Sequence, residues 1–402
     1  MDFKIEIPEY VNAVLNNLEV CGFEAFVVGG CVRDCLMGKT PYDWDICTNA
    51  TPEQTMAAFE NQMPVIPTGI KHGTVTIVSD GKPIEVTVYR TDSGYDDFRH
   101  PSEIKFIKDI RGDLSRRDFT VNAMAYNHKK GIIDLFDGQK DLKNGILRCV
   151  GTANLRFGED ALRIMRALRF AAVCSLNIED ETAKAIHENK GLLKCIAVER
   201  IYTELKKLLT AEKPSKILIE YRDVFEEIIP EAFAAENFDE NLFKAIDKLK
   251  ADSGLRFTAI LYSLENPREI LARLKTDKEI RSRICSVNQM AEEEAPLSKC
   301  DVKRIMHKWG KDAAFDWFLI NEKIKNDNRY SDAIKYAEEI LMNNECFELS
   351  SLAVNGSDLI ELGITSGHEI GEKLKLLLTA VIDGKEENKK NSLLAYLMSK
   401  EN

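Results

Sequence analysis

Residues 26–46 decide how this chain folds: they read Phe-Val-Val-Gly-Gly-Cys-Val-Arg-Asp-Cys-Leu-Met-Gly-Lys-Thr-Pro-Tyr-Asp-Trp-Asp-Ile. The apolar run from Ala25 to Val28 is typical of a buried strand, and residues 32–37 after the paired glycines read as the first turns of a helix. Where a strand, two glycines and a helix start follow one another, backbone N–H groups can approach an anion closely. Arg33 lies one turn into this helix, where its guanidinium can clamp phosphate oxygens. The first half of the stretch therefore predicts a phosphate-binding turn.

The second half of the stretch carries two carboxylates, Asp43 and Asp45, on either side of Trp44. Alternate side chains of an extended segment share a face, so these carboxylates project together from Cα atoms about 6.6 Å apart. This geometry suits one or two Mg²⁺ ions bound to a nucleoside triphosphate, as in enzymes of phosphoryl transfer. A paired glycine or an Asp-x-Asp alone is more often an ordinary turn or a solvated edge, but the two in this order are far more specific. The complete glycine patterns of a P-loop and of a Rossmann site are both absent.

The composition describes an ordinary soluble protein. The chain has 402 residues, of which 44% are hydrophobic and 30% charged, and this length allows two to four domains. No run approaches the 18 apolar residues of a membrane helix, and the acidic first ten residues are not typical of a signal or transit peptide. The ten cysteines include no Cys-x-x-Cys, which favours reduced thiols. We therefore expect a cytoplasmic protein that does not contact membranes.

The net charge of −11 is unusual for a protein that binds nucleic acid, but the charge is unevenly distributed. Residues 1–150 have a net charge of −5, whereas residues 151–217 hold 12 basic against 9 acidic side chains, a net +3. The basic excess thus directly follows the presumed catalytic segment, where an RNA end could dock.

Further elements are expected after the opening stretch. Residues 51–54, Thr-Pro-Glu-Gln, combine a capping Thr, a first-turn Pro and a Gln three residues later, so we expect a helix to about residue 61. Residues 73–78 and 83–90 alternate as strands around a turn and predict a hairpin. Glu85 lies on its second strand and is a candidate third carboxylate, although a strand Glu usually faces solvent.

Two polar segments follow the hairpin. Residues 91–108 are irregular, and so long a loop in a compact domain is usually functional or disordered. Residues 114–126 can form a helix with an apolar face, with Arg117 and Asp118 on its polar side. The simplest interpretation of this second segment is a surface helix.

Residues 159–170 hold the second strong signal, in which Asp160, Arg163 and Arg166 are spaced three apart on an expected helix. A salt-bridged amphipathic helix is the simplest interpretation. An Asp beside an Arg can also recognise a base, because the Arg donates to the ring nitrogen of cytosine or adenine and the Asp accepts from their exocyclic amine. Guanine and uracil present the opposite pattern and would leave buried groups unpaired. Since a row spaced by three drifts round a helix, Arg169 can lie away from the others.

These motifs resemble those of the class II tRNA nucleotidyltransferase and bacterial poly(A) polymerase family, within the polymerase-β-like nucleotidyltransferases. The shared motifs are Gly-Gly-x-Val-Arg-Asp followed by Asp-x-Asp, and the Glu-Asp-x-x-Arg that begins at Glu159. The resemblance covers residues 23–210 densely and returns near residues 354–384. Between these ranges, only helical periodicity supports the expected helices.

The resemblance implies an α+β fold. Its N-terminal part is a polymerase-β-like mixed sheet with helices, and all-α neck, body and tail segments follow in an elongated, curved array. The expected divisions are a nucleotidyltransferase head at 1–150, a nucleotide-selecting neck at 151–213, a body at 214–326 and a tRNA-binding tail at 327–402.

The resemblance also implies roles for the site residues in a two-metal phosphoryl transfer. Asp43 and Asp45 would hold Mg²⁺, and Glu85 would assist in positioning the metal or in deprotonation. The remaining candidates would bind the nucleotide: Gly30, Arg33 and Arg117 the triphosphate and sugar, Asp160 and Arg163 the base, and Arg166 and Arg169 further nucleotide or phosphate groups.

The implied reaction adds CCA to the 3′ end of tRNA from CTP and ATP. The loop at residues 91–108 resembles the flexible loop of enzymes that add the terminal A, with Asp96, Asp97 and Arg99 in its core. Three alternatives remain open: an enzyme that adds only CC or only A, a poly(A) polymerase, and a non-catalytic RNA-binding protein. No His is followed by Asp, so the His-Asp phosphohydrolase site of many relatives is not expected. The sequence is silent on oligomeric state and on Mg²⁺ against Mn²⁺.

Overall fold

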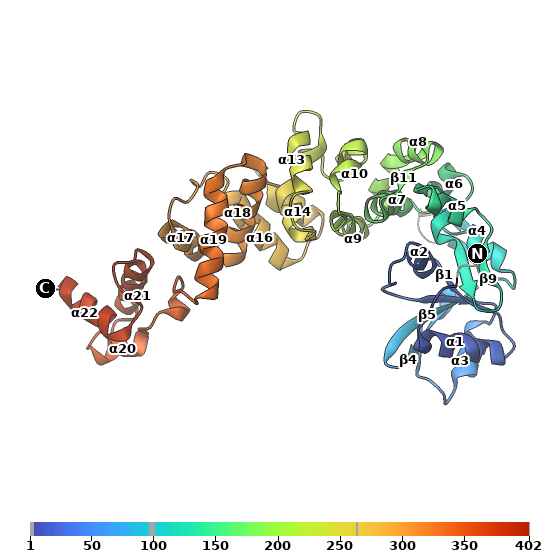
Figure 1. Ribbon diagram of the computed structural model, residues 1–402, viewed down its shortest axis with the longest axis horizontal. Helices are drawn as coiled ribbons and strands as arrows, with labels where there is room; N and C mark the ends of the chain where they lie inside the picture. The colour runs from blue at the N-terminus through green and yellow to red at the C-terminus, as the bar shows by residue number, and fades with distance from the viewer. Residues whose placement is uncertain (1–3, 96–100, 263, 402) are drawn as a thin grey trace. The chain divides into compact units, whose positions relative to one another are not determined.

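The chain divides into two compact units, which meet in sequence at Ala234 and Ala235 (Figure 1). The structure is a computed structural model that describes residues 4–95, 101–262 and 264–401. Asp96, Asp97 and Arg99 of the expected loop lie outside these residues. The four-part division and the curved arrangement of the segments stay predictions.

A seven-stranded mixed sheet forms the centre of the first unit, in the order β3-β4-β5-β2-β1-β8-β9. Its strands are β1 (Ala25–Val28), β2 (Asp45–Thr48), β3 (Val65–Gly69), β4 (Thr74–Ser79), β5 (Lys82–Val88), β8 (Met124–Asn127) and β9 (Gly131–Asp134). Only β2 and β5 pair in parallel; every other neighbouring pair is antiparallel. The sheet with its helices is the fold that the motifs predicted.

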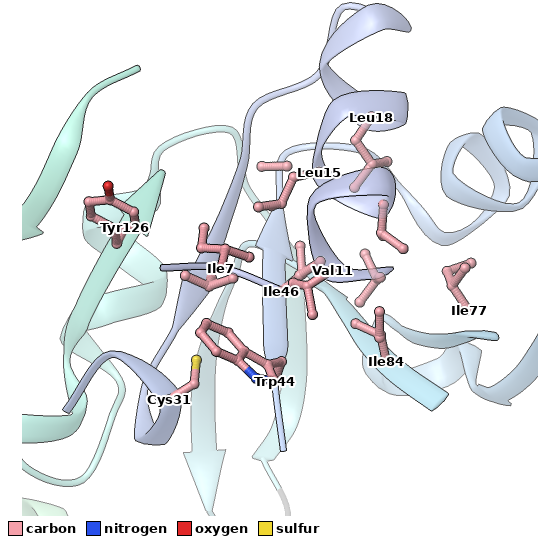
Figure 2. Packing of buried hydrophobic residues seen from close by; sticks show 14 of the residues in the cluster. Ile7, Val11, Leu15, Leu18, Cys31, Trp44, Ile46, Ile77, Ile84 and Tyr126 are labelled. Atoms are coloured by element: carbon pink, nitrogen blue, oxygen red, sulfur yellow. The ribbon is translucent and has the colours of Figure 1, made fainter. Parts of the chain in front are cut away.

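Strand β1 is buried on both faces, which explains its continuous apolar run. Ala25 and Val27 belong to the core on one face, and Phe26 and Val28 to the core on the other. Helix α1 (Glu9–Val20) covers the first face with residues spaced three and four apart, which are Val11, Val14, Leu15 and Leu18. Figure 2 shows this face, where Trp44 and Ile46 join the side chains of α1.

The predicted helix after residue 51 and the predicted hairpin are confirmed. Helix α3 (Pro52–Phe59) begins with a reciprocal capping box between Thr51 and Gln54. Strands β4 and β5 form the hairpin, and Asp80 and Gly81 turn the chain with φ angles of 51° and 71°.

The segment at residues 114–126 is not a helix, and the prediction for it was wrong. Helix α4 (Ile110–Ser115) ends there, a 3₁₀ turn η2 (Thr120–Asn122) follows, and Met124 then begins β8. The apolar residues from Met124 to Tyr126 are buried in the sheet, where β8 pairs with β1 on one side and with β9 on the other. The irregular loop expected at residues 91–108 likewise contains a strand pair, β6 (Arg90–Tyr95) and β7 (Pro101–Phe106).

The rest of the first unit is mainly helical. Its helices are α2 (Gly30–Leu36), α5 (Gly138–Lys143), α6 (Ala153–Glu159), α7 (Leu162–Cys174), α8 (Asp180–Asn189), α9 (Val198–Leu209), α10 (Ser215–Glu220), α11 (Arg222–Glu226) and α12 (Pro230–Phe233), with 3₁₀ turns η1 (Ile70–His72) and η3 (Lys190–Cys195). A separate parallel pair, β10 (Ile146–Leu147) and β11 (Asn177–Ile178), joins the start of this helical region to the end of α7.

The second unit is helical throughout its described residues, as the periodicity predicted. Its helices are α13 (Glu240–Ile246), α14 (Ser253–Ile260), α15 (Pro267–Arg273), α16 (Lys278–Gln289), α17 (Lys299–Trp309), α18 (Lys311–Lys325), α19 (Asn328–Met342), α20 (Gly356–Glu361), α21 (Gly367–Ile382) and α22 (Lys390–Glu401), with the 3₁₀ turn η4 (Leu349–Ser351). Trp317 of α18 packs edge-on against Tyr330 of α19, with ring centroids 5.3 Å apart. In the described parts of both units, no helix is long and apolar enough to cross a membrane.

The start of α5 gives a test of the fold. A Cβ on Gly138 would lie 2.3 Å from the carbonyl oxygen of Thr120, which is backbone and cannot yield easily, whereas a Cβ on Gly158 would meet nothing within 4 Å. We expect Gly138→Ala to destabilise the first unit by about 1–3 kcal/mol, and Gly158→Ala to be neutral or slightly stabilising. Calorimetry of the full chain measures both, and equal melting temperatures for the two variants would contradict this packing.

Candidate active site

The paired glycine joins β1 to α2 and brings an arginine close beneath the turn. Gly29 has a φ of 82°, and a Cβ there would lie 2.9 Å from Nη1 of Arg117. Position 29 therefore requires glycine for its backbone conformation and for its contact with Arg117. Gly30 begins α2, and a Cβ there would meet only Nη2 of Arg33, at 3.7 Å. The turn thus places Gly30, Arg33 and Arg117 together, and their binding of a nucleotide stays a prediction.

Three carboxylates gather beside this turn. Trp44 is buried in the core, so the chain presents Asp43 and Asp45 on the exposed side. Glu85 of β5 is the register partner of Asp45 across the parallel pair. Desolvation by the surrounding protein, and then the charges of Asp43 and Glu85, raise the pKa of Asp45 to about 6, while Arg117 opposes this shift. Asp45 nevertheless stays reachable from solvent.

The carboxylates fit a divalent cation that is shared with a substrate. Burial is the main cause of the raised pKa of Asp45, and the charges of Asp43 and Glu85 add to it; a bound cation would relieve this repulsion between the carboxylates. Among the described residues, no three His, Cys, Asp or Glu side chains form a ready-made metal cage. Mg²⁺ commonly takes only one or two carboxylates and completes its shell with water and substrate phosphates. Asp43 and Asp45 are a donor set of this kind.

Arg33 is held in place by two neighbours. Its Nη1 donates to Oδ1 of Asn122 at 2.6 Å, and its Nε and Nη2 donate to Oδ1 of Asp34 at 2.9 and 2.7 Å. Asn122 in turn donates to Asp118 at 3.1 Å. Asp118 accepts from Nε and Nη2 of Arg166 at 2.8 and 2.6 Å. A continuous hydrogen-bond network therefore joins α2 to α7.

Arg117 belongs to a second charged network, which reaches the β6–β7 hairpin. The buried carboxylate of Asp113 pairs with Arg117 at 3.3 Å and with Arg116 at 2.7 Å. Arg116 also pairs with Asp92 of β6 at 3.4 Å. Within the described part of the chain, Nε of Arg117 is buried without a hydrogen-bond partner.

Asp160 does not lie on one helix with Arg163 and Arg166, and this part of the sequence prediction was wrong. Helix α6 ends at Glu159, Asp160 is extended, and α7 begins at Leu162. The side chain of Asp160 accepts the N–H of Leu162 at 3.1 Å, which is how an aspartate terminates one helix and starts another. The expected single helix carrying Asp160, Arg163 and Arg166 is therefore interrupted between α6 and α7.

The side chains of Asp160 and Arg163 contact different partners, although the N–H of Arg163 donates to the carbonyl oxygen of Asp160 at 3.0 Å. Asp160 pairs with Arg200 of α9 at 3.4 Å. Arg163 donates through Nη1 to Glu159 and through Nη2 to the carbonyl oxygen of Arg116, the latter at 3.0 Å. The two side chains that were predicted to select the base lie on either side of the α6–α7 junction.

Arg169 lies close to Arg33 and Arg166, whereas its spacing of three residues from Arg166 suggested that it could lie away from the other arginines. Its Nε donates to Glu204 of α9, and its guanidinium lies 3.7 Å from the ring centroid of Phe170. Arg33 and Arg166 lie over the same ring.

The acidic and amide partners of the arginines were largely missed at the sequence level. Asp113 lies three and four residues before Arg116 and Arg117, a spacing that predicts helical ion pairs. Glu204 interrupts the buried stripe of α9, and a glutamate there requires a cationic partner. No local pattern indicates Asn122, whose partner Arg33 is 89 positions away.

Three protein families match successive parts of the chain. Residues 25–148 match "Poly A polymerase head domain", residues 175–235 match "Probable RNA and SrmB- binding site of polymerase A", and residues 252–397 match "tRNA nucleotidyltransferase domain 2 putative". The first of these groups nucleotidyltransferases, whose chemistry is typically metal-dependent.

Whole proteins are similar over nearly the full chain. The CCA-adding enzyme of Streptococcus thermophilus (strain CNRZ 1066) is 34% identical over 399 residues, which are 96% of this chain and 95% of the relative. The crystal structure of the Bacillus stearothermophilus CCA-adding enzyme in complex with CTP is 27% identical with a TM-score of 0.82, and 98% of each chain is covered. The Thermotoga maritima CCA-adding enzyme complexed with tRNA is 24% identical and has the same fold, with a TM-score of 0.72 over 99% of this chain and 97% of the other.

The buried pair of Asp118 and Arg166 predicts how stability depends on pH. Burial alone would raise the pKa of Asp118, but the charge and hydrogen bonds of Arg166 outweigh burial and lower this pKa to about 2. Because the folded pKa is depressed, the pair stabilises the fold fully above about pH 4, and this contribution is lost as the pH falls toward 2. We expect Asp118→Asn to destabilise the first unit by about 2 kcal/mol at pH 7, and its deficit to shrink below pH 4. Calorimetry at pH 7, 4 and 3 measures the deficit, and a deficit that stays constant would contradict the ion pair.

Proposed function

The chain belongs to the family of CCA-adding enzymes, and on this premise we propose that it adds C, C and A to the 3′ end of tRNA from CTP and ATP, without a nucleic-acid template. One observation carries the proposal: the glycine turn, the carboxylates and the α6–α7 junction all lie in the first unit of a chain that aligns end to end with such enzymes. The chemistry that the site needs and the similarity of the whole chain thus agree.

Asp43 and Asp45 are proposed to hold Mg²⁺, because they project from the exposed side of the chain beside the glycine turn. When bound, the metal would activate the RNA 3′-hydroxyl and neutralise charge that develops on the α-phosphate. Glu85, the register partner of Asp45, supports the site by positioning the cation or by accepting the hydroxyl proton.

The triphosphate is proposed to bind at the glycine turn. The backbone of Gly30 and the guanidiniums of Arg33 and Arg117 supply donors in a fixed arrangement. Asp34 and Asn122 orient Arg33 before any ligand arrives. The guanidinium of Arg117 lies at the turn, where its Nη1 would be 2.9 Å from a Cβ on Gly29. Arg166 and Arg169, both on α7, contribute positive charge to the same region.

Base selection is assigned to Asp160 and Arg163. Three of the N–H groups of Arg163 donate to protein acceptors, so two of the five in a guanidinium remain for a base. A carboxylate offers about four acceptor positions, and Asp160 uses one for Leu162 and directs one toward Arg200. Together the two side chains can present donors and acceptors that match cytosine and adenine but not uracil or guanine.

The RNA is proposed to contact the helices beyond the head, and to be recognised by its backbone shape. Residues 175–235 match an RNA-binding family, and the predicted tail at 327–402 lies mostly within a tRNA nucleotidyltransferase family match. We keep the predicted head, neck, body and tail as the functional divisions. The ten free cysteines agree with the cytoplasmic location that we also propose.

The activity test uses a tRNA trimmed to its discriminator base, with CTP, ATP and Mg²⁺, followed by sequencing of the 3′ ends. We expect ends in CCA and nothing longer. Asp43→Asn and Asp45→Asn keep the shape of the side chain but remove its charge, so each should lower the rate about a thousandfold. Asp180→Asn, on the exposed first turn of α8, is the matched control and should retain the wild-type rate.

Each other product would identify a different enzyme. Ends in CC, or A added only to prepared CC ends, would indicate a split activity, and long A tails a poly(A) polymerase. RNA binding without addition would indicate a non-catalytic protein.

Asp160→Ala tests the selection of bases by side chains. Removing the acceptor of the exocyclic amine is expected to reduce the preference for CTP over UTP at least about a hundredfold in kcat/KM. The measurement is single-nucleotide addition with each nucleoside triphosphate in turn. Full discrimination by Asp160→Ala would remove Asp160 from the selection mechanism without affecting the assignment of the carboxylates.

A further inference from the structure

Phe170 of α7 is surrounded by three arginines that belong to the nucleotide site. The carbon at the centre of each guanidinium lies close to the centroid of its ring, at 3.7 Å for Arg169, 4.8 Å for Arg33 and 5.3 Å for Arg166. The ring is only 6% exposed and packs edge-on against Phe119, with centroids 5.9 Å apart. One side chain is therefore the common contact of cations from α2 and α7.

Three like charges do not gather round an ordinary apolar side chain, because they repel each other. Here each arginine also has its own acidic partner. Arg33 forms an ion pair with Asp34, Arg166 with Asp118, and Arg169 with Glu204. These acids neutralise the arginines and lie on three separate segments of the chain, and Asp118 also links Arg166 to Arg33 through Asn122.

The aromatic ring adds an attraction that all three arginines share. The faces of a phenyl ring carry partial negative charge and attract guanidiniums within about 6 Å. Each guanidinium thus has a carboxylate on one side and the ring on another, and both contacts limit its rotation. Arginine carries much rotamer freedom, so an arrangement fixed in advance reduces the entropy that nucleotide binding would otherwise cost.

We infer that Phe170 is a positioning residue for the nucleotide: its ring holds Arg33, Arg166 and Arg169 in the arrangement that binds the triphosphate and sugar. The inference rests on the proposed function, which assigns these arginines to the nucleotide. Phe170 itself acts only through them. Its loss should weaken the binding of CTP and ATP alike, because Asp160 and Arg163, to which base selection is assigned, are held by other groups: Asp160 by Leu162, and Arg163 by Glu159 and Arg116.

The test measures steady-state kinetics of CTP and ATP addition to trimmed tRNA. Phe170→Leu keeps an apolar side chain but removes the aromatic face, and it should raise the KM of both nucleotides about tenfold. The kcat and the discrimination against UTP should stay near wild type, since uniform binding is lost. Phe170→Tyr keeps the ring and should restore the KM. The matched control is Phe157→Leu, a fully buried phenylalanine of α6 over whose ring no described guanidinium lies.

A second measurement keeps the size of the ring. Pentafluorophenylalanine at position 170 has nearly the shape of phenylalanine but reverses the charge of the ring faces, so it should raise the KM even where Phe170→Leu folds poorly. The inference would be overturned by any of three results. These are an unchanged KM for the fluorinated protein, a raised KM for Phe170→Tyr, and a KM rise in Phe157→Leu equal to that in Phe170→Leu. The wild-type protein is measured in the same assay. If the proposed function is wrong, the wild type will not add nucleotides; if only the inference about Phe170 is wrong, the wild type will add them normally.

Discussion

The close approach of Arg117 to the backbone of Gly29 is the contact on which the site depends. It exists because the chain leaves the interior strand β1 with a positive φ and has no side chain at this position. Arg117 can then lie near the carboxylate of Asp45, whose raised pKa it partly offsets. A side chain at position 29 would displace Nη1 of Arg117, which belongs to a cation that moderates the repulsion at Asp45.

The charged side chains of this site form ion pairs and hydrogen bonds in which one carboxylate serves two donor residues. Asp113 serves Arg116 and Arg117, and Asp118 accepts from both Asn122 and Arg166. A buried arginine without such a partner would carry the full penalty of desolvation. This explains how a chain with a net charge of −11 can hold an arginine-rich site. The acidic residues of this site balance its arginines instead of repelling an anionic substrate.

The sequence predicted the parts of the fold and site that rest on local patterns. Strand β1, the glycine turn, the capping box at Thr51 and the alternation about Trp44 each involve residues a few positions apart. It failed for β8, whose apolar residues fit either a helix or a strand until pairing with β1, about 100 positions earlier, decides between them. The arginine partners were missed for the same reason, since Arg166 and Asp118 are 48 positions apart.

The contact between Arg163 and Arg116 is the most informative one that no local pattern predicted. Arg163 donates to the carbonyl oxygen of Arg116, and the next residue is Arg117. If Arg163 selects the base and Arg117 binds the triphosphate, as proposed, a base that draws the guanidinium of Arg163 toward itself acts on the backbone that carries Arg117. Asp160 lies outside α7 and its side chain pairs with Arg200 of α9, while its carbonyl oxygen accepts the N–H of Arg163. The two side chains of the proposed base-selecting pair are therefore anchored on different elements: Arg163 on the segment before β8, and Asp160 on α9.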